Sequence, residues 1–247
     1  KSSAASDVYK RQRKPVIFLF PGTCCLYSSF DHILDRLHSY FYTVTVSYDG
    51  FDPNEKTEFY SMEDECEKIE QEIKKKYDGR IKAAYGCSLG GSFVSLLIQR
   101  KRIHIDHGII GSSDMDEAGR LVAKIQSSMV VPFMYKMIHT GVLPKFMQKK
   151  LNKTDEVKKE LYNGFFNMFG IGKGGSPWIT KQSIYNQFYS DLVTKVQHGI
   201  DVPGTTIHVF YATKMGKKYE KRYCSYFKNP DIRRYNCLLY TSPSPRD

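Results

Sequence analysis

The stretch AAYGCSLGGSF, residues 83–93, decides how this sequence is interpreted. Its first residues belong to the expected strand RIKAAYGC at 80–87, and its last residues open the apolar helical run GSFVSLLIQRK at 91–101. Its centre, GCSLG at 86–90, matches the pattern G-x-S-x-G, in which Gly86 and Gly90 leave room for crowded backbone around Ser88. The pattern predicts a nucleophile elbow, a strand-turn-helix unit that presents a reactive serine. The alternative is a turn of small residues without chemistry.

Apolar runs alternate with helical patterns along most of the chain. We expect strands at residues 15–20, 42–48, 80–87, 106–112, 205–212 and 231–236. Helices are expected at residues 28–41, 62–77, 91–101 and 217–227. This order predicts the α/β class, with a mostly parallel, doubly wound sheet covered by helices on both faces. Residues 113–200 interrupt the alternation with a long helical, aromatic-rich stretch, which we interpret as an inserted helical cap.

Two of the expected helices carry a possible capping signal at their start. Ser28 and Asp31 stand in capping-box register before the first helix. Ser61 and Asp64 stand in the same register before the second. Both serines are therefore expected to accept a hydrogen bond from the backbone of the helix that follows.

Composition excludes several classes of function. The net charge of +11 comes from short basic groups mixed with acidic residues, and no nucleic-acid-binding signature accompanies them. No apolar run is long enough to span a bilayer, and the first twenty residues lack the order of a signal peptide. The six cysteines show no metal-ligand spacing, which favours free thiols in the cytoplasm. GIGKGGSPW at 170–178 lacks the spacing of a phosphate-binding loop, so neither a cofactor nor a metal is expected.

Both ends of the sequence resemble translated sequencing-adapter read-through. Residues 1–12 and 237–247 show no usable periodicity, and we interpret them as non-native tails. The expectation is a single domain at residues 13–236 whose true C-terminus has been lost.

From residue 14 to residue 236 the chain resembles the α/β-hydrolase superfamily, and the elbow motif is the specific part of the resemblance. The family forms an oxyanion hole from two backbone N–H groups. The resemblance implies Leu89 as one donor. FPGTCC at 20–25 replaces the family's common His-Gly loop and implies Thr23 as the second donor, with Cys24 as the alternative.

The resemblance also implies an acid and a histidine, in the chain order Ser, Asp or Glu, His. At the usual position of the acid stands Met215, and Glu220 lies too far into the next helix. Some members carry the acid one strand earlier, which implies Asp114, with Asp116 as the second choice. The alternative is that both aspartates cap the following helix.

The sequence has seven histidines, and none follows the last expected strand, where the family places its catalytic histidine. We expect that this residue was lost with the C-terminus and that the present chain is nearly inactive. A substitute from the cap, His139 or His198, is the alternative.

The expected function is a cytoplasmic serine hydrolase acting on a small-molecule carboxylic ester or thioester. The Met- and Phe-rich segment at 129–147 suits a pocket for an apolar acyl group. Neither nucleic acid nor a membrane span is expected, and the sequence leaves the oligomeric state open. The alternative is a non-catalytic protein of the same fold that binds a small apolar ligand or a protein partner.

Overall fold

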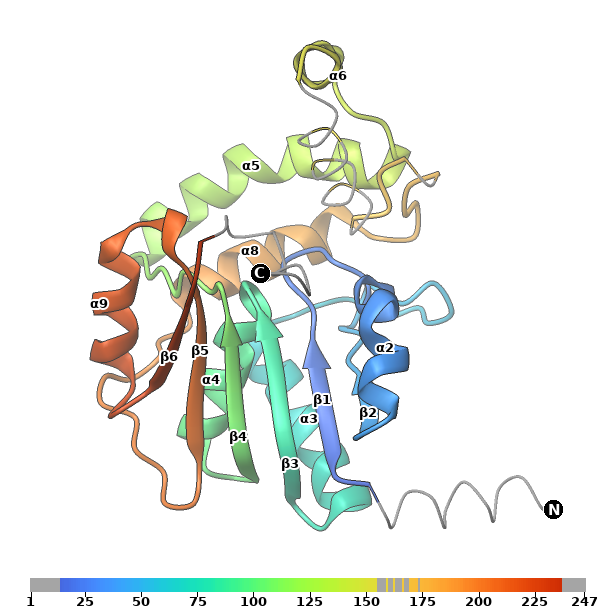
Figure 1. Cartoon of the computed structure of the whole chain (residues 1–247). Helices are drawn as coiled ribbons and strands as arrows, with labels where there is room; N and C mark the ends of the chain where they lie inside the picture. Colours follow the sequence, from blue (N-terminus) through green and yellow to red (C-terminus); the bar gives the residue numbers. More distant parts are fainter. Residues whose placement is uncertain are drawn as a thin grey trace, which may run out of the picture.

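A computed structural model of the chain describes residues 14–154, 159, 162, 166, 169–172 and 174–236. The two expected non-native tails lie outside these residues. In the described part, six strands form one sheet in the order β2-β1-β3-β4-β5-β6, and every neighbouring pair is parallel (Figure 1). The strands are β1 Val16–Phe20, β2 Tyr42–Thr45, β3 Arg80–Cys87, β4 His104–Gly111, β5 Thr206–Ala212 and β6 Asp231–Tyr235. The predicted fold class is confirmed.

Helices cover the two faces of this sheet. Along β1, Ile17 and Leu19 pack with one cluster, whereas Phe18 and Phe20 belong to the main core, as the two-residue period of a strand requires. The first face is covered by α2, Asp31–His38, and the main core packs under α3, Met62–Tyr77, and α4, Leu89–Arg100 (Figure 1). The last helix, α9 Lys217–Tyr226, adds Tyr223 to the main core.

One predicted cap is confirmed and the other is wrong. The Ser61 hydroxyl accepts a hydrogen bond from the Asp64 N–H at 3.1 Å at the start of α3. Ser28 caps nothing, because it lies inside a 3-10 turn, η1 Tyr27–Phe30, that runs directly into α2. The N-cap of α2 is therefore Phe30, whose backbone is already helical.

Among the described residues between β4 and β5 lie the helices α5 Arg120–Thr140, α6 Lys145–Asn152 and α8 Lys181–Val193. Figure 1 shows α5 and α6 above the carboxyl ends of the strands, with α8 between α5 and the sheet. Two backbone-to-serine hydrogen bonds join α8 to the segment before α3 and to the first residue of α3: Phe59 N–H to Ser183 at 3.2 Å and Met62 N–H to Ser190 at 2.7 Å. Helix α8 is thus fastened to the body of the domain.

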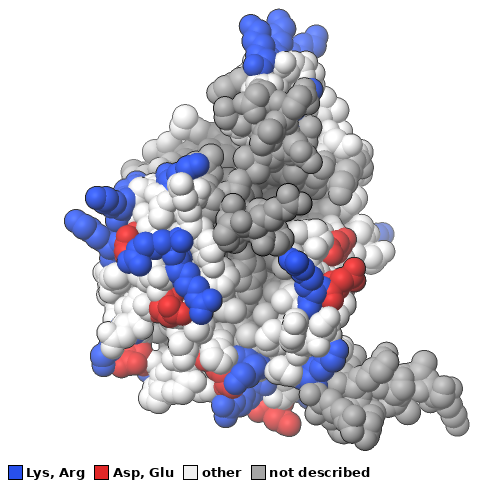
Figure 2. Space-filling model, in the orientation of Figure 1, with Lys and Arg blue, Asp and Glu red and all other residues white. Residues whose placement is uncertain are grey.

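The surface carries mixed charge. On the face shown in Figure 2, acidic side chains lie among most of the basic ones, while a basic group stands at the position of α6. Among the described residues, no helix combines the length and the apolar character that crossing a bilayer requires.

Candidate active site

Ser88 stands in a sharp turn at the carboxyl edge of the sheet. Strand β3 ends at Cys87 and α4 begins at Leu89, so the serine is the single residue between them. Its backbone has φ 53° and ψ −122°, a conformation that costs a non-glycine residue on the order of 1–3 kcal/mol. The Ser88 N–H donates to the Gly111 carbonyl at the end of β4, at 3.0 Å. This geometry is the strained strand-to-helix turn that the motif predicts.

The two motif glycines are required by contact with neighbouring backbone. A Cβ atom on Gly86 would lie 2.0 Å from the carbonyl oxygen of Gly90. A Cβ atom on Gly90 would lie 2.1 Å from the carbonyl oxygen of Phe20, in the adjacent strand β1. Neither obstacle is a side chain that could swing away, so any other residue would force the turn to open.

The loop after β1 lies against the serine. A Cβ atom on Gly22 would be 3.6 Å from the Ser88 Cβ and 3.4 Å from the Cys87 carbonyl oxygen. Residues 22–25 form a tight turn closed by the Cys25 N–H on the Gly22 carbonyl at 3.0 Å. Cys24 has φ 58°, which is the positive value that the third residue of a type II turn requires.

The turn distinguishes the two candidates for the second oxyanion donor. The Cys24 N–H donates to Gln187 Oε1 in α8 at 2.6 Å and is therefore occupied. In the described part of the chain no group accepts the Thr23 N–H. The Leu89 N–H is in the first turn of α4, where backbone donors have no partner within the helix. These observations favour Thr23 over Cys24 as the partner of Leu89.

A cavity of about 400 Å³ opens beside the serine. It brings together Ser88, Thr23, Asp114 and Asp116 from three separate parts of the sequence. Its described wall consists of Gly22, Thr23, Cys25, Cys87, Ser88, Asp114, Asp116, Val130, Met134, Phe169, Phe188, Asp191 and Leu192. Apolar side chains from α5 and α8 thus face a group of three carboxylates and the serine.

Asp114 and Asp116 follow β4 in a loop that α9 holds in place. Arg222 donates through Nη1 to the Asp114 carbonyl and to the Asp116 carboxylate, and the Tyr223 hydroxyl donates to the Ser113 carbonyl. Burial raises the pKa of the Asp114 carboxyl, and the negative charge of Asp116 adds to this. Neither aspartate is the N-cap of α5, because that position is Gly119. The helix-capping alternative is therefore wrong.

Asp191 is a third carboxyl group of the cavity, and the sequence analysis missed it. Burial, followed by the charge of Asp114, raises its pKa to about 7, while a hydrogen bond from the Ser92 hydroxyl acts in the opposite direction. The available signal was the buried face of α8, which is polar: Ser183, Gln187 and Ser190 are all buried there. Polar residues on the inner face of a helix indicate specific partners.

The turn after β5 offers no acid. Met215 ends a short 3-10 turn, η2 Thr213–Met215, and packs against the main core. Glu220 lies in α9 and binds Arg234, with 3.0 Å between Arg234 Nε and Glu220 Oε1. Neither residue lines the described wall of the serine cavity.

No histidine belongs to the described wall of this cavity. His198 is hydrogen-bonded to Ser225 at 2.6 Å and stacks on Tyr226. The ring centroids of His139 and Tyr135 lie 5.0 Å apart with the rings tilted by 38°, and the His139 Nδ1 is buried without a hydrogen-bond partner among the described residues. These contacts do not support either residue as a substitute base for Ser88.

A separate acidic group near α3 could hold a cation. Asp49, Asp64 and Glu65 present carboxylate oxygens within 4.8 Å of one another. The ammonium group of Lys68 lies 2.6 Å from the Asp49 carboxylate and also binds Asp64. The lysine therefore already supplies the positive charge that these carboxylates attract.

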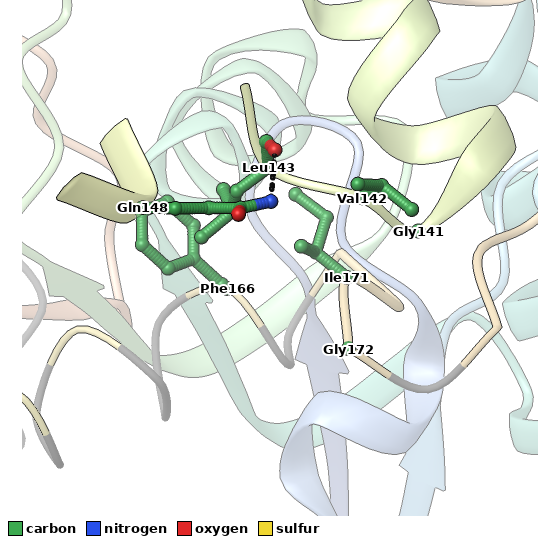
Figure 3. Close-up of a pocket in the computed structure, with 7 residues that line it drawn as sticks. All are labelled: Gly141, Val142, Leu143, Gln148, Phe166, Ile171 and Gly172. Atoms are coloured by element: carbon green, nitrogen blue, oxygen red, sulfur yellow. Dashed lines mark hydrogen bonds between the residues drawn. The ribbon is translucent and has the colours of Figure 1, made fainter. Parts of the chain in front are cut away.

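A second cavity, of about 440 Å³, lies between the residues that follow α5, α6 and the described residues Phe166, Ile171 and Gly172 (Figure 3). Its described wall is formed by Gly141, Val142, Leu143, Gln148, Phe166, Ile171 and Gly172. The Gln148 side-chain amide donates to the Leu143 carbonyl at 2.6 Å, so the polar group of this largely apolar wall is partly satisfied. The described wall shares no residue with that of the serine cavity.

The structure is similar to those of several hydrolases. It matches an alpha/beta hydrolase family protein from Desulfitobacterium hafniense with a TM-score of 0.66 and 14% sequence identity, over 90% of this chain and 87% of the other. It matches the RedJ thioesterase of the prodiginine pathway in Streptomyces coelicolor (TM-score 0.57, 14% identity, 96% and 84% covered). It also matches an enol-lactonase from Burkholderia xenovorans LB400 (TM-score 0.58, 11% identity, 92% and 85% covered).

No protein-family model matches the chain, and no curated protein matches it in sequence. At these identities, the similarity to solved structures shows the fold.

Proposed function

We propose that this chain, which has the α/β-hydrolase fold, is a serine hydrolase with Ser88 as its nucleophile. The observation that carries the proposal is the strained backbone of Ser88 beside a cavity and against the loop of Thr23. A conformation of this cost persists where the surroundings impose it, and such strain is concentrated at functional sites. The hydrolases that share the fold support the reaction class.

In the proposed reaction, Ser88 Oγ attacks the carbonyl carbon of an ester or thioester and loses its proton to a base. The carbonyl oxygen becomes an oxyanion, which the Leu89 and Thr23 N–H groups would stabilise. Collapse of this intermediate breaks the C–O or C–S bond, and the alcohol or thiol leaves with a proton. Water then attacks the acyl-serine in the same manner and releases the carboxylic acid.

The base is an imidazole in this proposal, oriented by Asp114 or Asp116. None of the seven histidines belongs to the described cavity wall, so the described site lacks this base. Loss of the histidine from a serine triad lowers kcat by on the order of 10⁶. The chain alone should therefore react slowly.

The cavity wall supports an acyl group with an apolar body. Val130 and Met134 of α5 and Phe188 and Leu192 of α8 line the cavity. A wall of flexible and aromatic side chains suits an acyl chain of modest length. The described cysteines are all free thiols, which supports the proposed cytoplasmic location.

A fluorophosphonate reagent tests the nucleophile, because it forms a stable phosphonyl adduct with an activated serine. We expect slow adduct formation that peptide mass spectrometry locates at Ser88, and none in Ser88→Ala. Ser28→Ala, at an exposed serine in the segment after β1, is the matched control and should react like the wild type. Adducts spread over several serines, unchanged in Ser88→Ala, would contradict the proposal.

A second candidate function is non-catalytic binding of a small apolar ligand. Met215, which occupies the turn after β5 where an acid would be expected, favours this alternative. Its signature would be saturable binding of a fatty acid or acyl amide that Ser88→Ala leaves unchanged, together with no phosphonyl adduct at Ser88 in the presence or absence of added imidazole.

A further inference from the structure

Helix α8 contacts both elements that would carry the oxyanion donors. Gln187 accepts the Cys24 N–H of the loop after β1. One helical turn later, Asp191 accepts a hydrogen bond from Ser92 in the first turn of α4, three residues after Leu89. Helix α8 therefore makes a hydrogen bond to each of the two elements that carry the Thr23 and Leu89 N–H groups.

The hydrogen bond of Gln187 is made in a fully buried environment. Gln187 and Cys24 are both 0% exposed, and 2.6 Å separates the Cys24 nitrogen from Gln187 Oε1. Removing such an acceptor would leave the Cys24 N–H buried and unsatisfied, which destabilises the turn in its present position. Because no solvent can replace the acceptor, the turn would have to move to satisfy its own backbone.

The backbone conformation of Cys24 shows why the turn at residues 22–25 needs further contacts to hold it. At φ 58°, a cysteine is in the left-handed region that only glycine adopts freely. The strain persists only where other contacts over-determine the conformation. The Gln187 acceptor fixes the Cys24 N–H, and the hydroxyl of Tyr48 holds the same loop by donating to the Pro21 carbonyl at 3.1 Å.

Helix α8 is itself held in place by hydrogen bonds to other elements. Besides its serine contacts, Asn186 donates through its side chain to the Phe59 carbonyl at 2.8 Å. The Ala118 N–H in the loop after β4 donates to the Leu192 carbonyl of α8 at 2.8 Å. The helix thus contacts the segment before α3, the oxyanion loop, α4 and the loop that carries the two aspartates.

We propose that Gln187 is a positioning residue of the active site: by accepting the Cys24 N–H, it holds the turn at residues 22–25 so that the Thr23 N–H faces the oxyanion. Because Gln187 accepts the Cys24 N–H, the neighbouring Thr23 N–H is the donor that is left to stabilise the oxyanion. This inference rests on the proposed function of Ser88. The side chain acts through the loop and does not touch substrate.

The test separates the reaction step from binding. Phosphonylation of Ser88 also develops negative charge on an oxygen in the hole, so its limiting rate reports on donor alignment, whereas the half-saturating concentration reports on the cavity. In Gln187→Met, which keeps length but removes the acceptor, we expect the limiting rate to fall about 10- to 100-fold with half-saturation unchanged. Gln182→Met, an exposed glutamine on the same helix, is the matched control and should match the wild type.

Gln187→Glu provides the conservative rescue, since it retains an oxygen acceptor at the same position. We expect it to restore the limiting rate at acidic pH, with the rate falling as pH rises, because a carboxylate charge near the hole opposes the developing oxyanion. An unchanged limiting rate in Gln187→Met, or no rescue by glutamate at any pH in a folded variant, would overturn the proposal.

Hydrogen exchange at the Cys24 amide keeps the inference independent of the proposed chemistry. We expect faster exchange at this amide in Gln187→Met and not in Gln182→Met. If the wild-type Ser88 formed no adduct under any condition, the proposed function would fail while faster exchange still supported the fastening of the loop. Unchanged exchange would overturn the positioning role itself.

Discussion

Two neighbouring loops leave the same edge of the sheet, and they are held in different ways. The turn at 86–90, where β3 passes into α4, is defined by close backbone contacts of Gly86 and Gly90 within the unit and with β1. The loop at 112–117, after β4, is held by Arg222 and Tyr223 of α9, more than 100 residues later in the sequence. The first loop can be recognised from five residues, and the second only from the folded chain.

We expect the largest loss of stability from a substitution in the turn at 86–90, whose shape is set by steric contacts. Gly90→Ala places a methyl group 2.1 Å from the Phe20 carbonyl oxygen, and we expect the free energy of unfolding to fall by about 3 kcal/mol. Denaturant unfolding measures this change. Gly119→Ala is the control, because its added Cβ meets nothing within 4 Å, and it should cost less than about 1 kcal/mol. Equal losses in the two variants would show that the turn is not sterically defined.

We expect a smaller change in stability from Asp191, whose carboxyl group interacts with the aspartates of the loop at 112–117. The pKa of Asp191 is about 7 in the folded chain, above its usual value, because of burial and of Asp114. Between the unfolded and folded pKa values the folded state binds the extra proton, so the free energy of unfolding falls as pH rises through this window.

Asp191→Asn removes this titration while retaining an acceptor for Ser92. We expect the variant to have a flatter stability profile than the wild type between pH 4 and pH 8. The groups facing Asp191 are Asp114, Asp116 and Ser92, with Arg222 bound to Asp116. Parallel profiles for the two proteins, measured by urea unfolding at each pH, would contradict this assignment.

We expect the smallest loss of stability from substitution of Arg222, the cationic residue of α9 that binds the loop at 112–117. Arg222→Leu removes the donor from the Asp114 carbonyl and the Asp116 carboxylate, and we expect a loss of about 1 kcal/mol. Hydrogen exchange should accelerate at residues 113–117 and stay unchanged at 86–90. Lys221→Leu, at an exposed lysine of the same helix, is the control. Acceleration at both loops would mean that they are not independently held.

The same distinction explains what the sequence could predict. The six strands, the cap at Ser61 and the turn of Ser88 depend on neighbours in the chain or on simple periodicity, and the structure has each of them. The false cap at Ser28 arose because the pattern does not reveal that a 3-10 turn precedes α2.

The contributions of Gln187 and Asp191 could not be predicted from their surroundings in the sequence. Gln187 meets Cys24 across 163 positions, and Asp191 meets Ser92 of α4 only in the folded chain. Polar residues on a buried helical face indicate that partners exist, but their identity is a property of the tertiary structure. The assignments of Asp114 and Thr23 share this dependence and stay predictions.

The measurement that tests the central claim most directly is the rate of phosphonylation at Ser88 with and without added imidazole. The cavity beside Ser88 has room for a free imidazole, which could accept the serine proton. We predict a saturable acceleration by imidazole, located at Ser88 by peptide mass spectrometry and absent in Ser88→Ala. No acceleration at any imidazole concentration, with Ser88 unmodified in a folded chain, would contradict the account and favour a ligand-binding protein of this fold.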